Sequence, residues 1–194
     1  MNTYRMNARW AGVFYIIATV APILTIFFVG FLGGGVAGEP IPDYLGNVSA
    51  NERHVIIGML IELIWALAVV GIVVTLFPIL KKYSEALVLG FSSLRFIEAI
   101  MAIVGGMAIL TLLTLSQEFV NAGVRDASYF QTTDALLIAA KDWAGIVEQF
   151  PYGLGALIFY IILFQSELVP RWLSGWGLVG ATLILVMGLL RVYG

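Results

Sequence analysis

The chain alternates long apolar stretches with short polar ones, and this pattern predicts five membrane-spanning helices. An α-helix of about 20 apolar residues crosses the hydrocarbon of a bilayer. The apolar residues are continuous rather than alternating, which favours a helix bundle over a closed barrel. We therefore expect an all-α, polytopic transmembrane helix bundle that forms one integral membrane domain over residues 1–194. The predicted spans cover about residues 10–32, 55–80, 85–116, 143–166 and 172–190.

The polar segments between the spans contain signals for helix ends. Ser49 and Glu52 have the spacing of a capping box, which predicts the start of the second span. Ser84 follows a pair of lysines and is a candidate N-cap for the third span. Residues 36–54 are interpreted as a polar loop, and residues 133–142 as a short interfacial helix before the fourth span.

The composition agrees with a membrane protein. Hydrophobic residues make up 61% of the chain and charged residues only 11%, with a mean hydropathy of +0.99. Soluble domains carry about 25% charged residues. The first apolar run, residues 10–38, is too long for the core of a secretory signal, so we expect it to be retained as a span.

Several kinds of site are excluded by residue types that the chain lacks. It contains no cysteine and one histidine, which excludes disulfides, thiolate metal sites and multi-histidine metal sites. We therefore expect no metal and no cofactor. A net charge of −2 gives no basis for a nucleic-acid partner.

The distribution of basic residues predicts the orientation in the cell membrane. Five spans place the two termini on opposite sides, and cytoplasmic loops are enriched in Lys and Arg. With the N-terminus cytoplasmic and the C-terminus outside, the inner basic residues are Arg5, Arg9, Lys81, Lys82 and Arg171. The outer basic residues are Arg53, Arg125, Lys141 and Arg191, on much longer loops.

Four ionisable residues lie inside the predicted spans: Glu62, Arg95, Glu98 and Glu148. A charge at the centre of a spanning helix costs about 2.5–3.5 kcal/mol. We therefore expect these side chains to face one another or a wet cavity rather than lipid.

Arg95 and Glu98 stand three residues apart in the stretch "SSLRFIEAI", which places them on one helix face. One interpretation is a structural ion pair that holds helices together. The other is a ligand site, because an ionisable residue inside the membrane is a functional candidate.

The acids outnumber the single arginine of the spans. Glu62, Glu98 and Glu148 lie on three different spans, and one arginine can pair fully with only one of them. Desolvation disfavours the charged form of a carboxyl group, so we expect at least one of the three to be protonated at neutral pH. The excess predicts an acid-rich polar pocket in the outer half of the bilayer.

Further polar and aromatic residues stand beside these acids. Trp65 lies on the same helix face as Glu62. Gln149 and Tyr152 lie near Pro151, which frees a backbone carbonyl in its helix. His54, at the mouth of the second span, is either a ligand or merely solvated. The candidate ligand-binding residues are thus Glu62, Arg95, Glu98, Glu148, Tyr152, Trp65, Gln149 and His54.

Three stretches carry a family resemblance: "RMNARWAGVFYIIATV", "SSLRFIEAIMAIVGG" and "LGALIFYIILFQSELVPRWLSGWGLVGA". With them, the chain resembles the domain of unknown function 4386 family over most of its length. The last stretch, with Ser166, Pro170, Arg171 and Trp172, is the most specific. The resemblance implies a small bacterial or archaeal multi-pass membrane protein, and it implies no activity.

Three functions stay open at this point. The leading one is binding or passage of a small cationic or amphipathic ligand at the intramembrane acids. The second is an intramembrane enzyme that acts on a lipid or another hydrophobic substrate with a Glu acid/base, but no motif selects a reaction and we favour a non-enzyme. The third is an accessory or structural subunit. The expected partners are the lipid bilayer and a small-molecule or lipid ligand, and the small-residue spacing of Gly177 and Ala181 leaves a homo-oligomer open.

Overall fold

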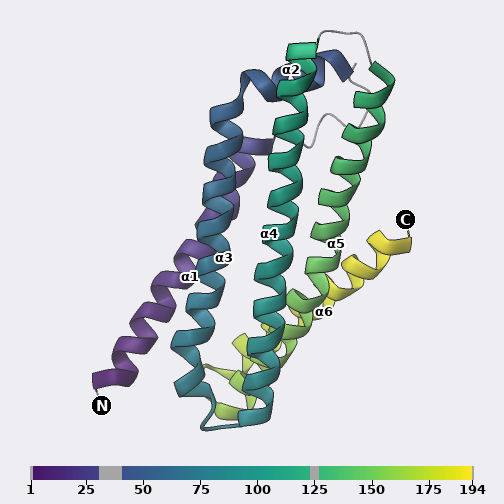
Figure 1. Ribbon diagram of the computed structural model, residues 1–194. Coiled ribbons are helices and arrows are strands. Elements are labelled where there is room, and N and C mark those ends of the chain that lie inside the picture. Colours follow the sequence, from purple (N-terminus) through teal and green to yellow (C-terminus); the bar gives the residue numbers. More distant parts are fainter. Residues whose placement is uncertain (1, 31–40, 123–126, 194) are drawn as a thin grey trace.

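The computed structural model is all-helical over the residues that it describes, which are 2–30, 41–122 and 127–193. These ranges contain no strand. The order of the elements can be followed in Figure 1. The helices are α1 (Asn2–Val29), α2 (Ile41–Ala50), α3 (Glu52–Leu80), α4 (Glu85–Ala122), α5 (Ala127–Ser166) and α6 (Arg171–Tyr193).

Five of these helices, all except α2, are long and apolar enough to cross a membrane. The prediction of a polytopic helix bundle is therefore confirmed, and the chain is a multi-pass membrane protein. Many large apolar side chains of α1 and α6 are exposed, among them Ile26, Phe27 and Leu190. Such surfaces suit contact with lipid.

Each spanning helix packs against the next spanning helix in the sequence. α1 packs on α3, α3 on α4, α4 on α5 and α5 on α6, while α2 lies across the end of the bundle against α4 (Figure 1). The start of α1 and the α3–α4 and α5–α6 turns share the opposite end, which we call the N-terminal end. There the Lys82 ammonium lies 3.9 Å from the centre of the Tyr4 ring. The other end is called the α2 end.

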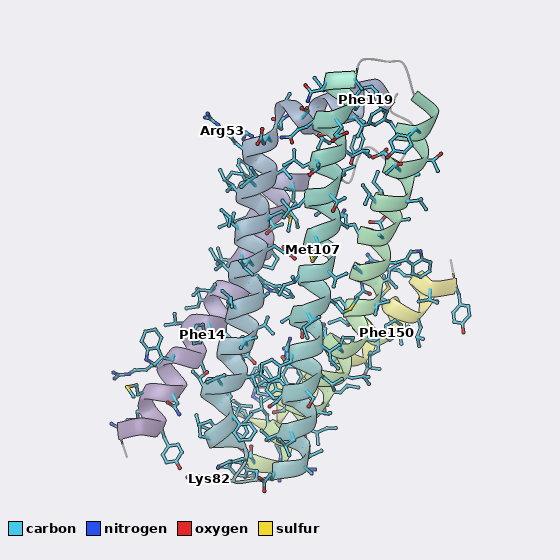
Figure 2. All side chains as sticks on the ribbon, in the orientation of Figure 1. Phe14, Arg53, Lys82, Met107, Phe119 and Phe150 are labelled. Carbon is cyan, nitrogen blue, oxygen red and sulfur yellow. The ribbon has the colours of Figure 1, made fainter. Side chains whose placement is uncertain are left out.

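Apolar cores close the bundle at both ends. At the N-terminal end the buried residues are Val73, Leu80, Val88, Phe91 and Ile162. At the α2 end a larger cluster includes Tyr44, Leu45, Val55, Leu112, Phe119 and Phe130. Figure 2 shows Phe119 at the α2 end and Lys82 at the N-terminal end. Glu62 of α3, Arg95 and Glu98 of α4, and Glu148 of α5 lie between these two cores along their helices.

Two predicted non-spanning segments are corrected by the structure. Residues 133–142 are not a separate interfacial helix but part of the continuous α5, because Phe130 and Ile138 are buried in the core of the α2 end. The expected loop at 36–54 contains α2, whose Leu45 and Val48 are buried in the same core. The first part of that loop, and the expected end of the first span near residue 32, lie outside the described residues.

The two capping predictions have different outcomes. The backbone N–H of Leu87 donates a hydrogen bond to the Ser84 hydroxyl at 3.3 Å, which confirms Ser84 as the cap of α4. The prediction that Ser49 and Glu52 form a capping box is wrong. Asn51 is the N-cap of α3 and makes no side-chain capping bond, since its amide donates to Asn47 instead. Ser49 lies within α2 and therefore cannot cap α3.

Candidate functional site

Arg95 and Glu98 form a buried ion pair on α4. Nη1 of Arg95 donates to both oxygens of the Glu98 carboxylate, at 2.8 and 2.7 Å. Glu98 is 0% exposed and Arg95 only 8%. The i, i+3 spacing brings the two side chains together without help from another helix, and the predicted ion pair is thus confirmed.

Aromatic rings cover the guanidinium of this pair. Its central carbon lies 5.0 Å from the centre of the Tyr152 ring on α5 and 5.8 Å from that of Phe91 on α4. Cations are attracted to the faces of such rings. One donor, the buried Nε of Arg95, has no hydrogen-bond partner. The arginine is therefore neutralised by its own helix but is not fully hydrogen-bonded.

A cavity of about 380 Å³ lies beside the ion pair, and we call it the Arg95 cavity. Four helices line it, so it occupies the middle of the bundle rather than a single interface. Its polar and aromatic lining residues are Tyr15 and Thr19 of α1, Trp65 of α3, Arg95 and Glu98 of α4, and Glu148 and Tyr152 of α5. The predicted residues Trp65 and Tyr152 are thus brought to the ion pair.

A second cavity of about 390 Å³ lies nearer the α2 end, and we call it the Glu62 cavity. Its polar lining residues are Thr25, Glu62, Lys141 and Glu148, while glycines and apolar residues such as Met59, Gly106 and Ile109 complete the wall. The Thr25 hydroxyl lies close enough to the Glu62 carboxylate to interact with it, but not in the geometry of a full hydrogen bond.

Glu148 lines both cavities and so lies at their junction. It is within electrostatic range of Glu98 and Glu62. Among the described residues, no ion pair includes Glu62 or Glu148. These two half-buried acids therefore differ from Glu98, which has a cation on its own helix.

Lys141 is a second cation of the site that the sequence analysis placed in an outer loop. It lies within the fourth candidate span, on α5, two helical turns before Glu148, and lines the Glu62 cavity. Its nearest described carboxylate is that of Asp142, at 3.8 Å. On one continuous helix, residues seven positions apart lie on the same face, so a prediction of a continuous α5 would have placed Lys141 beside Glu148.

Hydroxyl groups of α1 were also missed, because the first span contains no charge. Tyr15 and Thr19 line the Arg95 cavity, and the buried Tyr15 hydroxyl has no hydrogen-bond partner. The Tyr15 ring lies 6.3 Å from that of Phe159 on α5, which brings α1 close to α5 across the bundle. The i, i+4 spacing of Tyr15 and Thr19 marks this face in the sequence.

Two predicted residues lie away from the cavities. His54 is exposed at the start of α3, with its ring 5.9 Å from that of Phe28. Gln149 faces Gly188 of α6, where its side-chain oxygen would lie 3.5 Å from an added Cβ. Neither residue lines the Arg95 cavity or the Glu62 cavity.

The described residues include no group of three or more His, Asp or Glu side chains arranged to hold a metal ion. The site instead combines one closed ion pair, two acids without a cation partner in the described part of the chain, and one lysine at the cavity wall. Such an arrangement can bind a cationic group or move a proton between carboxylates.

Comparison with known proteins identifies the family but no activity. A family model described as "Domain of unknown function (DUF4386)" matches residues 10–193. No curated protein and no solved structure matches the chain. Since the match covers nearly the whole sequence, the chain belongs to the DUF4386 family.

Proposed function

We propose that this membrane protein binds a small cationic or amphipathic ligand whose cationic group lies between Glu62 and Glu148. One observation carries the proposal: two carboxylates from different helices line one cavity of about 390 Å³, and neither has an ion-pair partner among the described residues. Arg95 is already bound by Glu98. A bound cation would therefore supply the missing charge.

The energetics of a bilayer favour a charged occupant. A carboxylate inside a spanning helix costs about 2.5–3.5 kcal/mol at the helix centre. A cation between Glu62 and Glu148 offsets this cost for both side chains at once. Lys141 contributes positive charge at the same cavity wall, but its nearest described carboxylate belongs to Asp142.

The cavity also limits the size and character of the ligand. Small-molecule sites are commonly about 300–1,000 Å³, largely apolar, with a few placed polar groups. The Glu62 cavity falls at the lower end of this range and is lined mainly by glycines and apolar side chains. These features support a compact organic cation rather than a hydrated metal ion.

The position of Glu148 extends the proposal from binding to passage. Because Glu148 lines both cavities, a cation released from the Glu62 cavity meets the Arg95 cavity next. There the Trp65 ring offers an aromatic face that attracts cations, whereas the Tyr152 ring already lies against the Arg95 guanidinium. Glu148 would then be the side chain that passes the ligand from one cavity to the other.

We place the N-terminus in the cytoplasm, the C-terminus outside and the Glu62 cavity in the outer half of the cell membrane. This orientation is supported by the basic residues near the N-terminal end, since cytoplasmic segments are enriched in Lys and Arg. These residues are Arg5, Arg9, Lys81, Lys82 and Arg171. Accessibility of cysteines introduced at Lys82 and Asn47 to a membrane-impermeant thiol reagent tests this orientation in intact cells.

Ligand-dependent thermal stability tests the binding proposal. The probe is benzyltrimethylammonium, and its uncharged carbon isostere, neopentylbenzene, is the control ligand. We expect benzyltrimethylammonium to raise the melting temperature of the protein in nanodiscs, and neopentylbenzene to leave it unchanged. Glu62→Gln and Glu148→Gln should abolish the shift, while Glu118→Gln, an exposed acid of α4, should retain it.

An absence of any shift in the wild-type protein contradicts the proposal. So does an equal shift with the uncharged isostere, because the carboxylates would then not select the ligand. If Glu62→Gln and Glu148→Gln alter only the basal melting temperature and no probe acts on the wild type, a structural subunit is the better account.

A further inference from the structure

A groove on the lipid-facing side of α3 and α4 leads to Glu62. It has a volume of about 240 Å³ and is lined almost entirely by apolar side chains. Several of them are exposed, including Leu60, Leu63, Ile103 and Met107. In a multi-pass membrane protein such a surface faces the acyl chains of the bilayer. Glu62 is the one carboxylate of its lining.

The groove and the Glu62 cavity lie on two sides of a thin partition. Met59, Glu62, Ala102 and Gly106 line both spaces. The methyl group of Met59 occupies the position that a Cβ on Gly106 would take, so the glycine makes room for the methionine. Methionine has an unbranched, adaptable side chain. Met59 is therefore the apolar residue of this partition whose side chain can move by a change of rotamer.

Charge complementarity selects the occupant of the joined space. A carboxylate next to hydrocarbon favours a positive head group, and it repels the phosphate of ordinary phospholipids. The apolar lining of the groove favours an alkyl chain. Both requirements are met by a cationic amphiphile with a single alkyl chain.

We propose that the α3–α4 groove is a lateral entry from the bilayer, in which a cationic amphiphile places its alkyl chain along the groove and its head group at Glu62, with Met59 as the gate. This inference rests on the proposed function, because the head group occupies the cation site of the Glu62 cavity. It adds the route of entry and the chemical class of the ligand.

Photolabelling tests the entry route. The probe is a decyltrimethylammonium analogue with a diazirine at the end of its alkyl chain, added to the protein in phosphatidylcholine nanodiscs. We expect mass spectrometry to find the label concentrated on Leu60, Leu63, Ile103 and Met107. The trimethylammonium group has no N–H to donate, so Glu62 attracts it through charge alone, and Glu62→Gln should lower labelling of the groove by about tenfold. Excess benzyltrimethylammonium should lower it as well.

A matched pair of tryptophan variants separates the groove from the cation site. Ile103 lines the groove but not the Glu62 cavity, whereas Ile100 is an exposed isoleucine of α4 that lines neither. Ile103→Trp should lower the label in the groove and leave the benzyltrimethylammonium shift in melting temperature unchanged. Ile100→Trp should change neither.

The two proposals fail in different ways. Label spread evenly over the lipid-facing residues of α6, or groove label that Glu62→Gln leaves unchanged, overturns the lateral entry. If benzyltrimethylammonium still stabilises the protein through Glu62 and Glu148, the proposed function survives that result. If benzyltrimethylammonium has no effect on the wild type, the cation site itself is wrong and the entry route falls with it.

Discussion

Glu98 and Glu148 belong to neighbouring helices and line the same Arg95 cavity, yet their partners differ. Glu98 is completely buried and bound at both oxygens by Arg95 of its own helix. Glu148 is half-buried, lies at the junction of two cavities and has no ion-pair partner among the described residues. One carboxylate is thus closed to further ligands, and the other faces open space.

This difference separates the structural and the functional interpretation of intramembrane charge. A buried pair whose charges are neutralised within one helix needs no ligand for charge balance, and its loss should act mainly on folding. An acid that faces a cavity with another acid, as Glu148 does with Glu62, has no ion-pair partner among the described residues and gains one when a cation enters the cavity. Substitutions in the Arg95–Glu98 pair should therefore change the stability of the fold, whereas substitutions of Glu62 or Glu148 should change ligand binding.

The largest effect is expected from breaking the closed pair. Arg95→Gln leaves the buried Glu98 without its cation, and removing one partner of a buried pair costs about 3–5 kcal/mol. The free energy of unfolding, measured by SDS titration in mixed micelles, should fall by this amount. Arg191→Gln, an exposed arginine near the end of α6, is the control and should change it little.

The double variant Arg95→Leu/Glu98→Leu sharpens this test. Replacing both members of a buried ion pair by apolar residues is often nearly neutral, so most of the lost stability should return. A loss for Arg95→Gln no larger than that for Arg191→Gln would show that the pair does not hold the bundle together.

A smaller loss of stability is expected from a larger side chain at Gly155, where α5 approaches α4 beside the Arg95–Glu98 pair. A Cβ at Gly155 would lie 3.4 Å from the Cβ of Leu94, whereas one at Gly145 would have no neighbour within 4 Å. Gly155→Val should thus destabilise the protein by about 1–3 kcal/mol through overpacking. Gly145→Val should change stability much less.

For ligand binding, the two valine variants should rank in the opposite order, with the larger loss of binding in Gly145→Val. Gly145 lines the Glu62 cavity and Gly155 does not, so Gly145→Val should weaken the thermal shift by benzyltrimethylammonium more than Gly155→Val does. Equal losses of binding would indicate that the cation does not occupy the Glu62 cavity.

The features that the sequence predicted depend on local spacing. Five spans follow from the length and apolarity of their runs, and the Arg95–Glu98 pair follows from an i, i+3 spacing. Neither requires knowledge of how the helices pack. Ser84 as a cap is predictable for the same reason.

The features that were missed depend on tertiary packing. The polar segment before the fourth span is helical because Phe130 and Ile138 are buried against other helices, and without that continuity Lys141 could not be placed in the site. The contribution of Tyr15 depends on how α1 leans across the bundle toward α5. The sequence predicted one polar pocket for the intramembrane acids, but it did not predict that Glu62 and the Arg95–Glu98 pair line two different cavities with Glu148 at their junction.

The smallest effect is expected from Lys141. Its ammonium group is partly exposed at the wall of the Glu62 cavity, where it repels an entering cation. Interactions between such exposed charges contribute about 0.2–1 kcal/mol. Lys141→Gln should therefore raise the affinity for benzyltrimethylammonium by up to about fivefold, as measured by titration of the thermal shift. Lys81→Gln, at the N-terminal end, is the matched control, and an equal rise there would assign the effect to net charge alone.

The most direct test of the central claim is the position of a bound cation in a crystal structure. The probe is 4-bromobenzyltrimethylammonium, whose bromine atom is located by anomalous scattering. We predict one bromine peak inside the Glu62 cavity, with the trimethylammonium group between Glu62 and Glu148. A bromine peak beside the Arg95–Glu98 pair, or peaks only on the lipid-facing surface, would contradict the assignment of the open acids as the cation site.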